Sequence, residues 1–359
     1  MRALVPAGGL GSRLRPLTQT GAKQLLPIGN KPIIHYVLED IRDAGITDVV
    51  VLVGTETAAG ITANLKDGSE WGLEIQYVHQ DQPLGLAHCV ITAEELLRGD
   101  SFVMYLGDNM HKDELRPYAD DFRGGSSNAT VLLSQVSEPR EFGVAQFDQE
   151  GALQKLVEKP ENPPSEWVMT GMYLFDETIL KAVHAIKPSR RNELEITDAI
   201  QWLIDHGYDV QHRKLEGWWK DTGRPDDLLE ANLLVLQSLR REIDATATID
   251  AKSQLMGDIK VGAGVVINRS VIRGPVIIGD GAVIKDSYIG SSTSLGARSK
   301  IIHSEVSCSI VMEGAVVDDL PTPIDWSLIG RDAVVRRSDN QPKAVNLIVG
   351  DVSRVALVF

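Results

Sequence analysis

Apolar residues follow two different periods along this chain, and the change falls near residue 250. Up to that point, short apolar runs typical of strands alternate with stretches of helical periodicity. The clearest strand-like runs are residues 3–6, 49–53, 102–106 and 130–133. This alternation predicts an α/β fold with a Rossmann-like, mainly parallel mixed sheet covered by helices, in which ligands bind beyond the carboxyl ends of the strands.

The helical period is clearest in residues 32–44. Its apolar positions recur in steps of three and four, and Gly45 stands where a helix C-cap is expected. These positions are Ile33, Ile34, Val37, Leu38 and Ile41. A second helical pattern, rich in leucine, spans residues 226–242 and is expected to connect two domains.

Beyond residue 250 the apolar positions are spaced by 6, 5, 6, 6, 5, 6 and 6 residues, a period that no helix has. They are Val261, Ile267, Ile272, Ile278, Ile284, Ile289, Leu295 and Ile301, and glycine follows four of them. Hexapeptide repeats of this kind predict a left-handed parallel β-helix, because one apolar residue of each short strand points inward and small residues turn each corner. A run of β-hairpins is the alternative, but it would show strict two-residue alternation.

The chain of 359 residues is long enough for two domains at roughly 150 residues each. We expect a catalytic domain over residues 1–242 and a β-helix domain with a C-terminal tail over residues 243–359. Residues 344–358 are expected to close the solenoid with a strand or two. Cys89 and Cys308 lie far apart without a CxxC pair, which predicts two reduced thiols rather than a disulfide or a zinc site.

Charge and hydropathy exclude several classes of function. The formal net charge of −14 argues against a nucleic-acid binder, which needs basic surfaces to displace counterions. No apolar run approaches the 18 residues of a membrane span, so we expect no membrane partner and a cytoplasmic location. Anionic ligands must then be held by a few local cations.

A glycine-rich segment follows the first predicted strand and reads Ala-Gly-Gly-Leu-Gly-Ser-Arg from residue 7. Its backbone amides can approach phosphates closely, and Arg13 supplies charge. It is neither the dinucleotide-binding fingerprint, because Leu14 stands at the third glycine position, nor a P-loop. Taken alone, the segment is either a phosphate loop or a plain strand-to-loop turn.

The segment continues as GGLGSRLRPLT and AKQLLPIGNKP, which resembles the signature of the sugar nucleotidylyltransferases. The likeness runs on in family order through Gln80, Gly-Asp-Asn at 107–109, Phe-Gly-Val at 142–144, Glu-Lys-Pro at 158–160 and Trp-Lys-Asp-Thr-Gly at 219–223. With hexapeptide repeats behind these motifs, the chain resembles the long-form glucose-1-phosphate thymidylyltransferases of that family.

The resemblance implies transfer of a nucleotidyl group from dTTP or UTP to glucose 1-phosphate, with release of pyrophosphate. Two phosphorylated substrates bring many negative charges together, so the protein must neutralise charge and align the attacking oxygen. We expect Arg13 and Lys23 to hold the triphosphate and the leaving pyrophosphate, and Lys159 to hold the sugar phosphate. Each of these side chains, taken alone, could instead be a solvated surface cation, and without the resemblance that reading is favoured for Lys23 and Lys159.

Two carboxylates are candidates for a Mg²⁺ site. Asp108 follows the apolar run 102–106, and Asp221 falls in a tryptophan-rich stretch. Hard carboxylate oxygens from two separate loops suit Mg²⁺, which otherwise keeps waters and binds substrate phosphates. Without the resemblance, Asp108 is equally a helix N-cap or turn residue and Asp221 a turn residue.

The resemblance also implies contacts to the rest of both substrates. Base selection is expected from the side-chain amide of Gln80 and the backbone near Gly85, because an amide offers a donor and an acceptor to a pyrimidine edge. The other expected nucleotide contacts are Gly8, Gly9, Gly11, Ser12, Gln24, Pro83 and Asp108. The expected sugar-phosphate contacts besides Lys159 are Asn109, Gly143, Glu158, Gly171 and Thr197.

Three alternatives remain open. UTP instead of dTTP would make the chain a uridylyltransferase with the same mechanism. Acyl transfer in the β-helix, with His303 as general base, would make it bifunctional. A degenerate site would make it a regulatory subunit, but Asp108, Asp221 and the three cations are all present. We favour a structural role for the β-helix as an assembly surface of a homo-oligomer.

Overall fold

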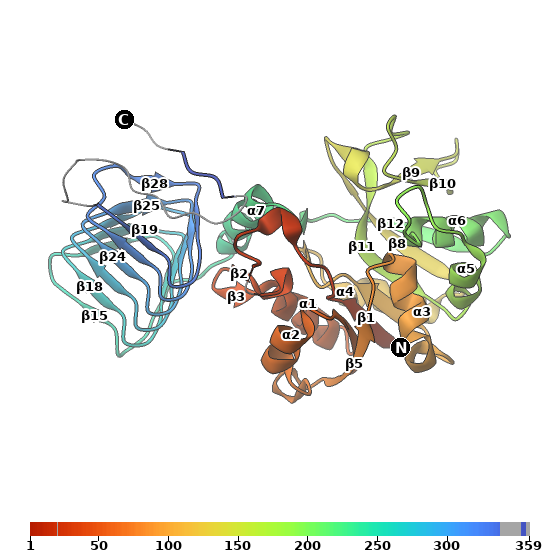
Figure 1. The fold of residues 1–359 in the computed structure, drawn as a ribbon, viewed down its shortest axis with the longest axis horizontal. Coiled ribbons are helices and arrows are strands. Elements are labelled where there is room, and N and C mark those ends of the chain that lie inside the picture. The colour runs from red at the N-terminus through yellow and green to blue at the C-terminus, as the bar shows by residue number, and fades with distance from the viewer. Residues whose placement is uncertain (20, 338–352, 357–359) are drawn as a thin grey trace. The chain divides into compact units, whose positions relative to one another are not determined.

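The computed structural model describes residues 1–19, 21–337 and 353–356 (Figure 1). The chain divides into two compact units, which we describe separately. Unit 1 consists of Met1–Gly11, Gly21–Leu25 and Ile33–Asp221; unit 2 consists of Ser12–Thr20, Leu26–Pro32 and Thr222–Phe359. The assignment of catalysis to residues 1–242 and of assembly to residues 243–359 remains a prediction. Within the described residues, no helix has both the length and the apolar character that a membrane span requires.

Unit 1 is built on a nine-stranded mixed sheet in the order β10-β9-β11-β6-β1-β4-β5, with β8 pairing β11 and β12 pairing β8. The strands β6, β1, β4 and β5 are parallel, whereas β11 runs antiparallel to β6, β8 and β9. The nine strands are β1 (Arg2–Pro6), β4 (Asp48–Gly54), β5 (Glu74–Gln80), β6 (Phe102–Tyr105), β8 (Ala129–Gln135), β9 (Gly143–Phe147), β10 (Leu153–Glu158), β11 (Trp167–Phe175) and β12 (Val210–Lys214). The four strand-like runs of the sequence are β1, β4, β6 and β8.

Helices cover both faces of this sheet, because successive strand residues point to opposite sides. Leu4 packs in the cluster formed with α3 (Leu86–Leu97), α5 (Ile179–Ala185) and α6 (Ile196–Asp205). Its neighbour Val5 packs on the other face, with α1 (Ile33–Asp43), α2 (Ala58–Leu65) and α4 (Leu115–Gly124). The predicted helix 32–44 is α1, its five apolar positions are buried, and Gly45 follows it with φ +72°.

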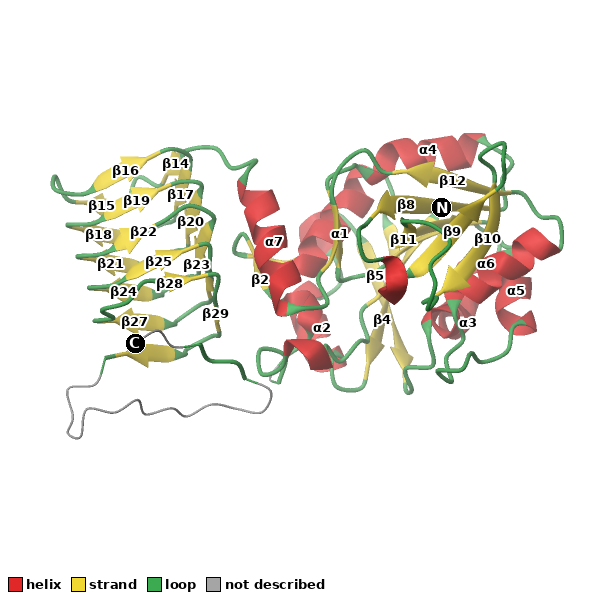
Figure 2. Ribbon diagram, turned by 90° about the horizontal axis from the view of Figure 1, so that it is seen from above, coloured by secondary structure: helices red, strands yellow, loops and turns green. Residues whose placement is uncertain are grey.

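Unit 2 contains the predicted β-helix, whose short strands stack in three parallel sheets (Figure 2). One sheet holds β14 (Glu242–Ile243), β17 (Ile259–Val261), β20 (Val276–Ile278), β23 (Thr293–Leu295), β26 (Ile310–Val311) and β29 (Leu328–Ile329). The second holds β15 (Thr248–Ile249), β18 (Val266–Asn268), β21 (Val283–Lys285), β24 (Lys300–Ile302), β27 (Val316–Asp318) and β30 (Val334–Arg336). The third holds β16 (Gln254–Met256), β19 (Val271–Arg273), β22 (Tyr288–Ile289), β25 (Glu305–Ser307) and β28 (Ile324–Asp325).

The register of the β-helix confirms the apolar period of the sequence. Val261 pairs with Ile278, which in turn pairs with Leu295 in the next coil. All eight predicted repeat positions are buried in the single core of the solenoid. The expected closure by residues 344–358 falls mainly outside the described residues, and residues 353–356 form no strand.

Two other elements of unit 2 precede the solenoid. The hairpin of β2 (Pro27–Ile28) and β3 (Lys31–Pro32) packs with α7 (Pro225–Leu236). Buried Asn232 of α7 accepts hydrogen bonds from the N–H of Gly29 (2.9 Å) and the hydroxyl of Ser294 (2.6 Å). The helix predicted for 226–242 was too long: it ends at Leu236, because turn bonds such as that from Leu239 N to Leu236 O end it before β14 begins the solenoid.

The remaining elements are short. They are the 3₁₀ turns η1 (Ser12–Leu14), η2 (Lys23–Leu25), η3 (Ser69–Trp71) and η4 (Pro139–Glu141), and the antiparallel pair of β7 (Asn109–His111) and β13 (Trp219–Asp221). Cys89 and Cys308 are both free thiols, as expected.

Candidate active site

The carboxyl ends of β6, β1, β4 and β5 lie side by side at one edge of the sheet of unit 1. Gly107, just after β6, donates its N–H to the carbonyl of Pro6 at the end of β1 (3.0 Å). A Cβ on Gly54, at the end of β4, would lie only 2.7 Å from the carbonyl oxygen of Gly8. These glycines let the strand ends approach closely, so the edge presents backbone rather than side chains.

Polar residues stand at both ends of this edge. Asp108 follows β6, and Gln80 is the last residue of β5. Three strand spacings separate β6 from β5, which is roughly 14 Å. The edge is therefore broad enough to accommodate a nucleoside between Gln80 and Asp108.

Lys23 and Asp108 form an ion pair at the β6 end of the edge. The amide of Asn109 adds a hydrogen bond to the Asp108 carboxylate (3.1 Å). Burial by itself raises the pKa of Asp108, but the Lys23 ammonium and these hydrogen bonds outweigh it and lower this pKa overall. The site thus keeps the buried carboxylate of Asp108 ionised beside the ammonium group of Lys23, whose side chain is mostly buried.

The small β7–β13 sheet brings the second candidate carboxylate to the same place. In its register Asp221 is the partner of Asn109, the residue next to Asp108. The indole N–H of Trp219 donates to Oδ1 of Asn109 (2.7 Å), which locks the two strands together through side chains. Two segments far apart in sequence therefore place Asp108 and Asp221 on neighbouring backbone.

This pair of carboxylates fits a Mg²⁺ ion that is completed by substrate. Across the described chain, no three His, Cys, Asp or Glu side chains gather into a metal-binding group. Two hard oxygen donors without a full cage suit Mg²⁺, which keeps waters and binds substrate phosphates. They suit a structural zinc poorly, because zinc prefers four nitrogen or sulfur ligands.

Gln24 lies beneath the glycine-rich segment with an unused acceptor. Its side chain is buried, and among the described residues no group donates to its Oε1. A Cβ placed on Gly9 would lie 3.5 Å from Cε of Lys23 and 4.0 Å from Nε2 of Gln24, so Gly9 leaves both side chains uncovered. A buried oxygen without a donor is costly, which indicates that a ligand supplies the donor.

At the other end of the edge, Gln80 is buried and held by the first turn of α3. Its Nε2 lies 2.8 Å from Nδ1 of His88 and 3.5 Å from Sγ of Cys89. Gly85 precedes α3 with φ +104°, and a Cβ there would meet the carbonyl of Leu194 at 2.4 Å. The chain therefore enters α3 by a route that only glycine allows, which presents backbone beside Gln80.

The predicted sugar contacts converge on a second group of elements. Glu158 ends β10, and its Oε2 accepts a hydrogen bond from the hydroxyl of buried Thr197 in α6. A Cβ on Gly143 of β9 would lie 2.9 Å from that hydroxyl and 3.3 Å from Oε2 of Glu158. Gly143 thus keeps the space in front of this carboxylate open.

Gly171 and Lys159 complete this region. Gly171 has φ +75° where β11 shifts its register against β8, and a Cβ there would lie 3.0 Å from Oδ1 of Asn109. Lys159 follows β10, its side chain is exposed, and its N–H donates to the carbonyl of Phe142 (3.0 Å). Asn109, Gly171 and the Glu158 group therefore lie along β11 and its neighbours.

Four further residues were expected to contact the nucleotide. Ser12 and Arg13 belong to unit 2, where they begin the turn η1, and both are exposed. Gly11 has φ +60°, and Pro83 is exposed on the loop between β5 and α3. Their roles toward the nucleotide remain predictions.

Sequence reasoning missed His88 and Arg191 as partners of site residues. Arg191 Nη1 lies 3.7 Å from Oε1 of Glu158 and its Nε lies 3.4 Å from Glu195, the N-cap of α6. No local pattern marks either residue. The one available signal is the position of His88 in the first turn of a helix that begins directly after Gly85.

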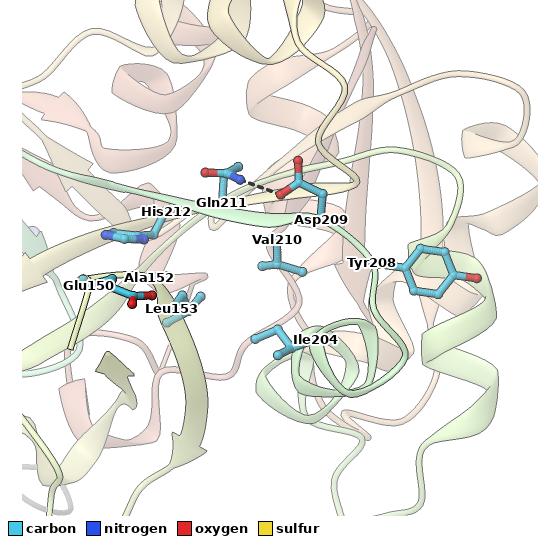
Figure 3. A pocket seen from close by; sticks show the side chains of 10 residues that line it. Glu150, Ala152, Leu153, Ile204, Tyr208, Asp209, Val210, Gln211 and His212 are labelled. Carbon is cyan, nitrogen blue, oxygen red and sulfur yellow. Dashed lines mark hydrogen bonds between the residues drawn. The ribbon is translucent and has the colours of Figure 1, made fainter. Parts of the chain in front are cut away.

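Two other polar groupings contain none of these residues. A cleft of about 450 Å³ in unit 1 is lined by Glu150, Leu153, Ile204, Tyr208 and His212 among others, and contains none of the predicted site residues (Figure 3). In unit 2, Nε2 of His303 lies 3.3 Å from Asp286, whose carboxylate pairs with Arg269. His303 is exposed at a corner of the β-helix.

Comparison with known proteins shows the family of this chain. Residues 2–238 match the nucleotidyl transferase family. A glucose-1-phosphate thymidylyltransferase of Streptomyces griseus is 45% identical over 357 residues, which cover 99% of both chains.

Two solved structures share the fold over about two thirds of the chain. A Bacillus anthracis structure assigned to glucose-1-phosphate thymidylyltransferase and holding sucrose is 36% identical, with a TM-score of 0.62 over 65% of this chain and 94% of that one. A UDP-glucose pyrophosphorylase bound to UDP-glucose is 25% identical, with a TM-score of 0.59 over 66% of this chain and 98% of that one.

Proposed function

This chain belongs to the nucleotidyl transferase family, and from that premise we propose that it joins glucose 1-phosphate to dTTP, giving dTDP-glucose and pyrophosphate. The observation that carries the proposal is the edge of the sheet in unit 1. It has an amide at one end for a base, and at the other an ionised carboxylate paired with a lysine for phosphates. The full-length similarity to a relative of that activity supports the same substrates.

In the proposed reaction a phosphate oxygen of glucose 1-phosphate attacks the α-phosphorus of the triphosphate, and pyrophosphate leaves in line. Lys23 offsets the negative charge of the triphosphate, and Arg13 and Lys159 act likewise on the leaving group and the sugar phosphate. Gln24 accepts a hydrogen bond from the nucleoside. No side chain has to form a covalent bond.

Asp108 and Asp221 would hold Mg²⁺ in this site. When bound, the ion stabilises developing charge on the phosphates and aligns them. The contribution of the protein is to keep Asp108 ionised in a buried place, which Lys23 and Asn109 do. Asn109 is in turn held by Trp219, so the carboxylate is fixed before substrate arrives.

The sugar is proposed to lie against Glu158 and Thr197. A carboxylate that already accepts one hydrogen bond has further lone pairs for two vicinal hydroxyls of a hexose. Gly143 provides the space, because any side chain there would fill the volume in front of both groups.

UTP is the second candidate for the nucleotide. The similarity to a UDP-glucose pyrophosphorylase favours it, and uracil presents the same hydrogen-bonding edge as thymine to Gln80. One methyl group in a pocket is worth only about 1 to 3 kcal/mol. Acceptance of both nucleotides, with dTTP preferred, is therefore the expected result.

The test is pyrophosphate release with Mg²⁺ and glucose 1-phosphate, measured separately with dTTP, UTP, CTP, ATP and GTP. The proposal predicts release with dTTP, weaker release with UTP, and loss of both when EDTA removes the metal. Preference for UTP would make the chain a uridylyltransferase. Preference for a purine triphosphate would contradict the assignment of Gln80 to a pyrimidine.

For the β-helix we propose a structural role in a homo-oligomer. Its stacked coils offer a rigid surface, and solenoids of this type associate through their flanks or ends. Light scattering of the full chain and of a chain lacking residues 250–359 tests this role. Unchanged assembly after the deletion, together with lost turnover, would contradict it.

A further inference from the structure

The amide of Gln80 is held by two neighbours in the first turn of α3. Its Nε2 lies 2.8 Å from Nδ1 of His88 and 3.5 Å from Sγ of Cys89. Both distances are those of hydrogen bonds that an amide NH₂ group can donate, one through each hydrogen. The nitrogen of Gln80 is thereby fully used inside the protein.

The oxygen of the same amide has a different environment. Within the described residues no group donates a hydrogen bond to Oε1 of Gln80, yet this atom is not sealed from solvent as Oε1 of Gln24 is. An acceptor that is accessible but unused is oriented for an incoming donor.

Cys89 weakly favours the same orientation of the amide. Its thiol donates to the carbonyl of Gly85 (3.6 Å), so only sulfur lone pairs face Gln80. An amide turned by half a rotation would place Oε1 against those lone pairs. The neighbouring hydroxyl of Thr92 donates to the carbonyl of His88 (2.7 Å) and so leaves the lone pair of His88 Nδ1 for Gln80.

We propose that His88, with Cys89 behind it, is a positioning residue that fixes the Gln80 amide with its oxygen toward the nucleobase and so selects pyrimidines that carry an N3–H. Thymine and uracil donate N3–H to such an oxygen. Cytosine presents a lone pair at N3 and would meet acceptor against acceptor, so it is rejected although its ring has the same size. This inference rests on the proposed function, which places the base at Gln80.

The selectivity depends on a single rotation of one side chain. With the outward oxygen replaced by the outward NH₂ group, the same glutamine would donate to cytosine N3. An amide without His88 is held only by the weak contact to sulfur and samples both rotations. One neutral hydrogen bond biases such an equilibrium by about tenfold.

The experiment compares kcat/KM for dTTP and dCTP, with glucose 1-phosphate saturating, in the wild type and three variants of the full chain. His88→Leu removes the acceptor, and we expect the dTTP-to-dCTP ratio to fall about tenfold. His88→Asn is the matched rescue of similar size, because its side-chain oxygen can accept from Nε2 of Gln80. It is expected to keep most of the wild-type ratio.

The control is His79→Leu. His79 is exposed and adjoins Gln80 on β5, so its side chain points to the opposite face of the strand. This variant removes a histidine beside Gln80 without touching the amide, and it should leave the ratio unchanged. Because each ratio compares two substrates on one preparation, a general loss of folded enzyme does not move it.

A second measurement does not depend on a variant. In the wild type, the ¹⁵N resonances of the His88 imidazole should show Nδ1 unprotonated and Nε2 protonated. Protonated Nδ1 in the neutral ring, or an unchanged ratio in His88→Leu with dTTP still turned over, would overturn the inference and leave the proposed function intact. Absence of turnover with dTTP and UTP in the wild type would contradict both the inference and the proposed function.

Discussion

The stacked serines in the β-helix of unit 2 and the buried glutamine at the sheet edge of unit 1 differ in whether their hydrogen-bonding groups have partners. In the β-helix, serines stack one above another: Ser287 N donates to Ser270 Oγ, and Ser304 N to Ser287 Oγ, at intervals of 17 residues. Each of these hydroxyls also donates to a carbonyl of its own coil. In unit 1, by contrast, Oε1 of Gln24 has no donor among the described residues.

The difference shows what each region is built to do. In the repeat, each of these stacked serines is satisfied by the serine of the neighbouring coil, so their polar atoms stabilise the fold, although the buried hydroxyl of Ser299 has no partner among the described residues. The sheet edge keeps polar atoms buried but available, which costs stability and is typical of binding sites. The two ring nitrogens of His111 are likewise buried without a hydrogen-bond partner among the described residues, and they belong to the same region.

The largest expected effect comes from the same substitution made in both regions. Asp108→Asn removes a carboxylate that would hold the metal and pairs with Lys23, so kcat/KM should fall roughly a thousandfold. Asp286→Asn breaks the ion pair with Arg269 in the β-helix and should leave kcat/KM unchanged. Pyrophosphate release at saturating Mg²⁺ measures both, and near wild-type turnover of Asp108→Asn would contradict the metal assignment.

The two regions should also respond to pH with opposite sign. Burial raises the pKa of Asp40 to about 7, although hydrogen bonds from Leu115 and Tyr105 oppose the shift. The folded state therefore binds a proton that the unfolded state releases above its pKa of 3.8, so unit 1 loses stability as pH rises from about 4 to 7, by an amount on the order of 4 kcal/mol. Asp40→Asn should flatten this dependence in thermal unfolding curves.

In the β-helix the acidic groups shift the other way. The pKa values of three aspartates are lowered by hydrogen bonds that their carboxylates accept. The donors are Thr246 for Asp244, Ser253 for Asp250 and Arg269 for Asp286. Their contribution is present above the unfolded pKa of 3.8 and is lost as pH falls through the lower folded values. If the unfolding temperatures of unit 1 and of the β-helix changed with pH in the same direction, the predicted opposite pH dependence would be wrong.

A glycine-to-alanine substitution should change substrate binding in the sheet of unit 1 but only stability in the β-helix. Gly143→Ala puts a methyl in front of Glu158 and Thr197, so KM for glucose 1-phosphate should rise on the order of tenfold. Gly279→Ala in the β-helix puts a methyl 2.5 Å from the backbone nitrogen of Ala297, which should cost about 1 to 3 kcal/mol of stability without changing KM. An altered KM in Gly279→Ala would couple the two regions and break the comparison.

The smallest expected effect is that of Asp286→Asn on stability. Arg269 is largely exposed, and such ion pairs contribute little because solvent screens them. The unfolding temperature of the β-helix should stay the same within error. A clear decrease would show that the Arg269–Asp286–His303 stack is a structural support of the corner.

Periodic features could be predicted from the sequence down to single residues. The eight repeat positions of the β-helix are its core, because one inward residue per strand is a local rule. Asp108 could be placed at the sheet edge because it follows an apolar strand, whereas Gln80 was expected at the site only from the family resemblance. The helix after residue 225 was predicted too long, since leucine spacing continues beyond the turn that ends it at Leu236.

Contacts between distant segments could not be predicted in the same way. The pairing of Asn109 with Asp221 depends on a two-stranded sheet of only three residues per strand. The hold of His88 on Gln80 depends on where α3 begins relative to the end of β5. Neither leaves a periodic trace, because each is set by tertiary packing.

The most direct test of the account is the identity of the product. Wild type, Asp286→Asn and Asp108→Asn are each incubated with dTTP, glucose 1-phosphate and Mg²⁺, and the nucleotide products are identified by mass. The account predicts dTDP-glucose with one pyrophosphate per turnover from the first two proteins and almost none from the third. Formation of dTDP and inorganic phosphate without a sugar nucleotide, or equal product from Asp108→Asn, would contradict it.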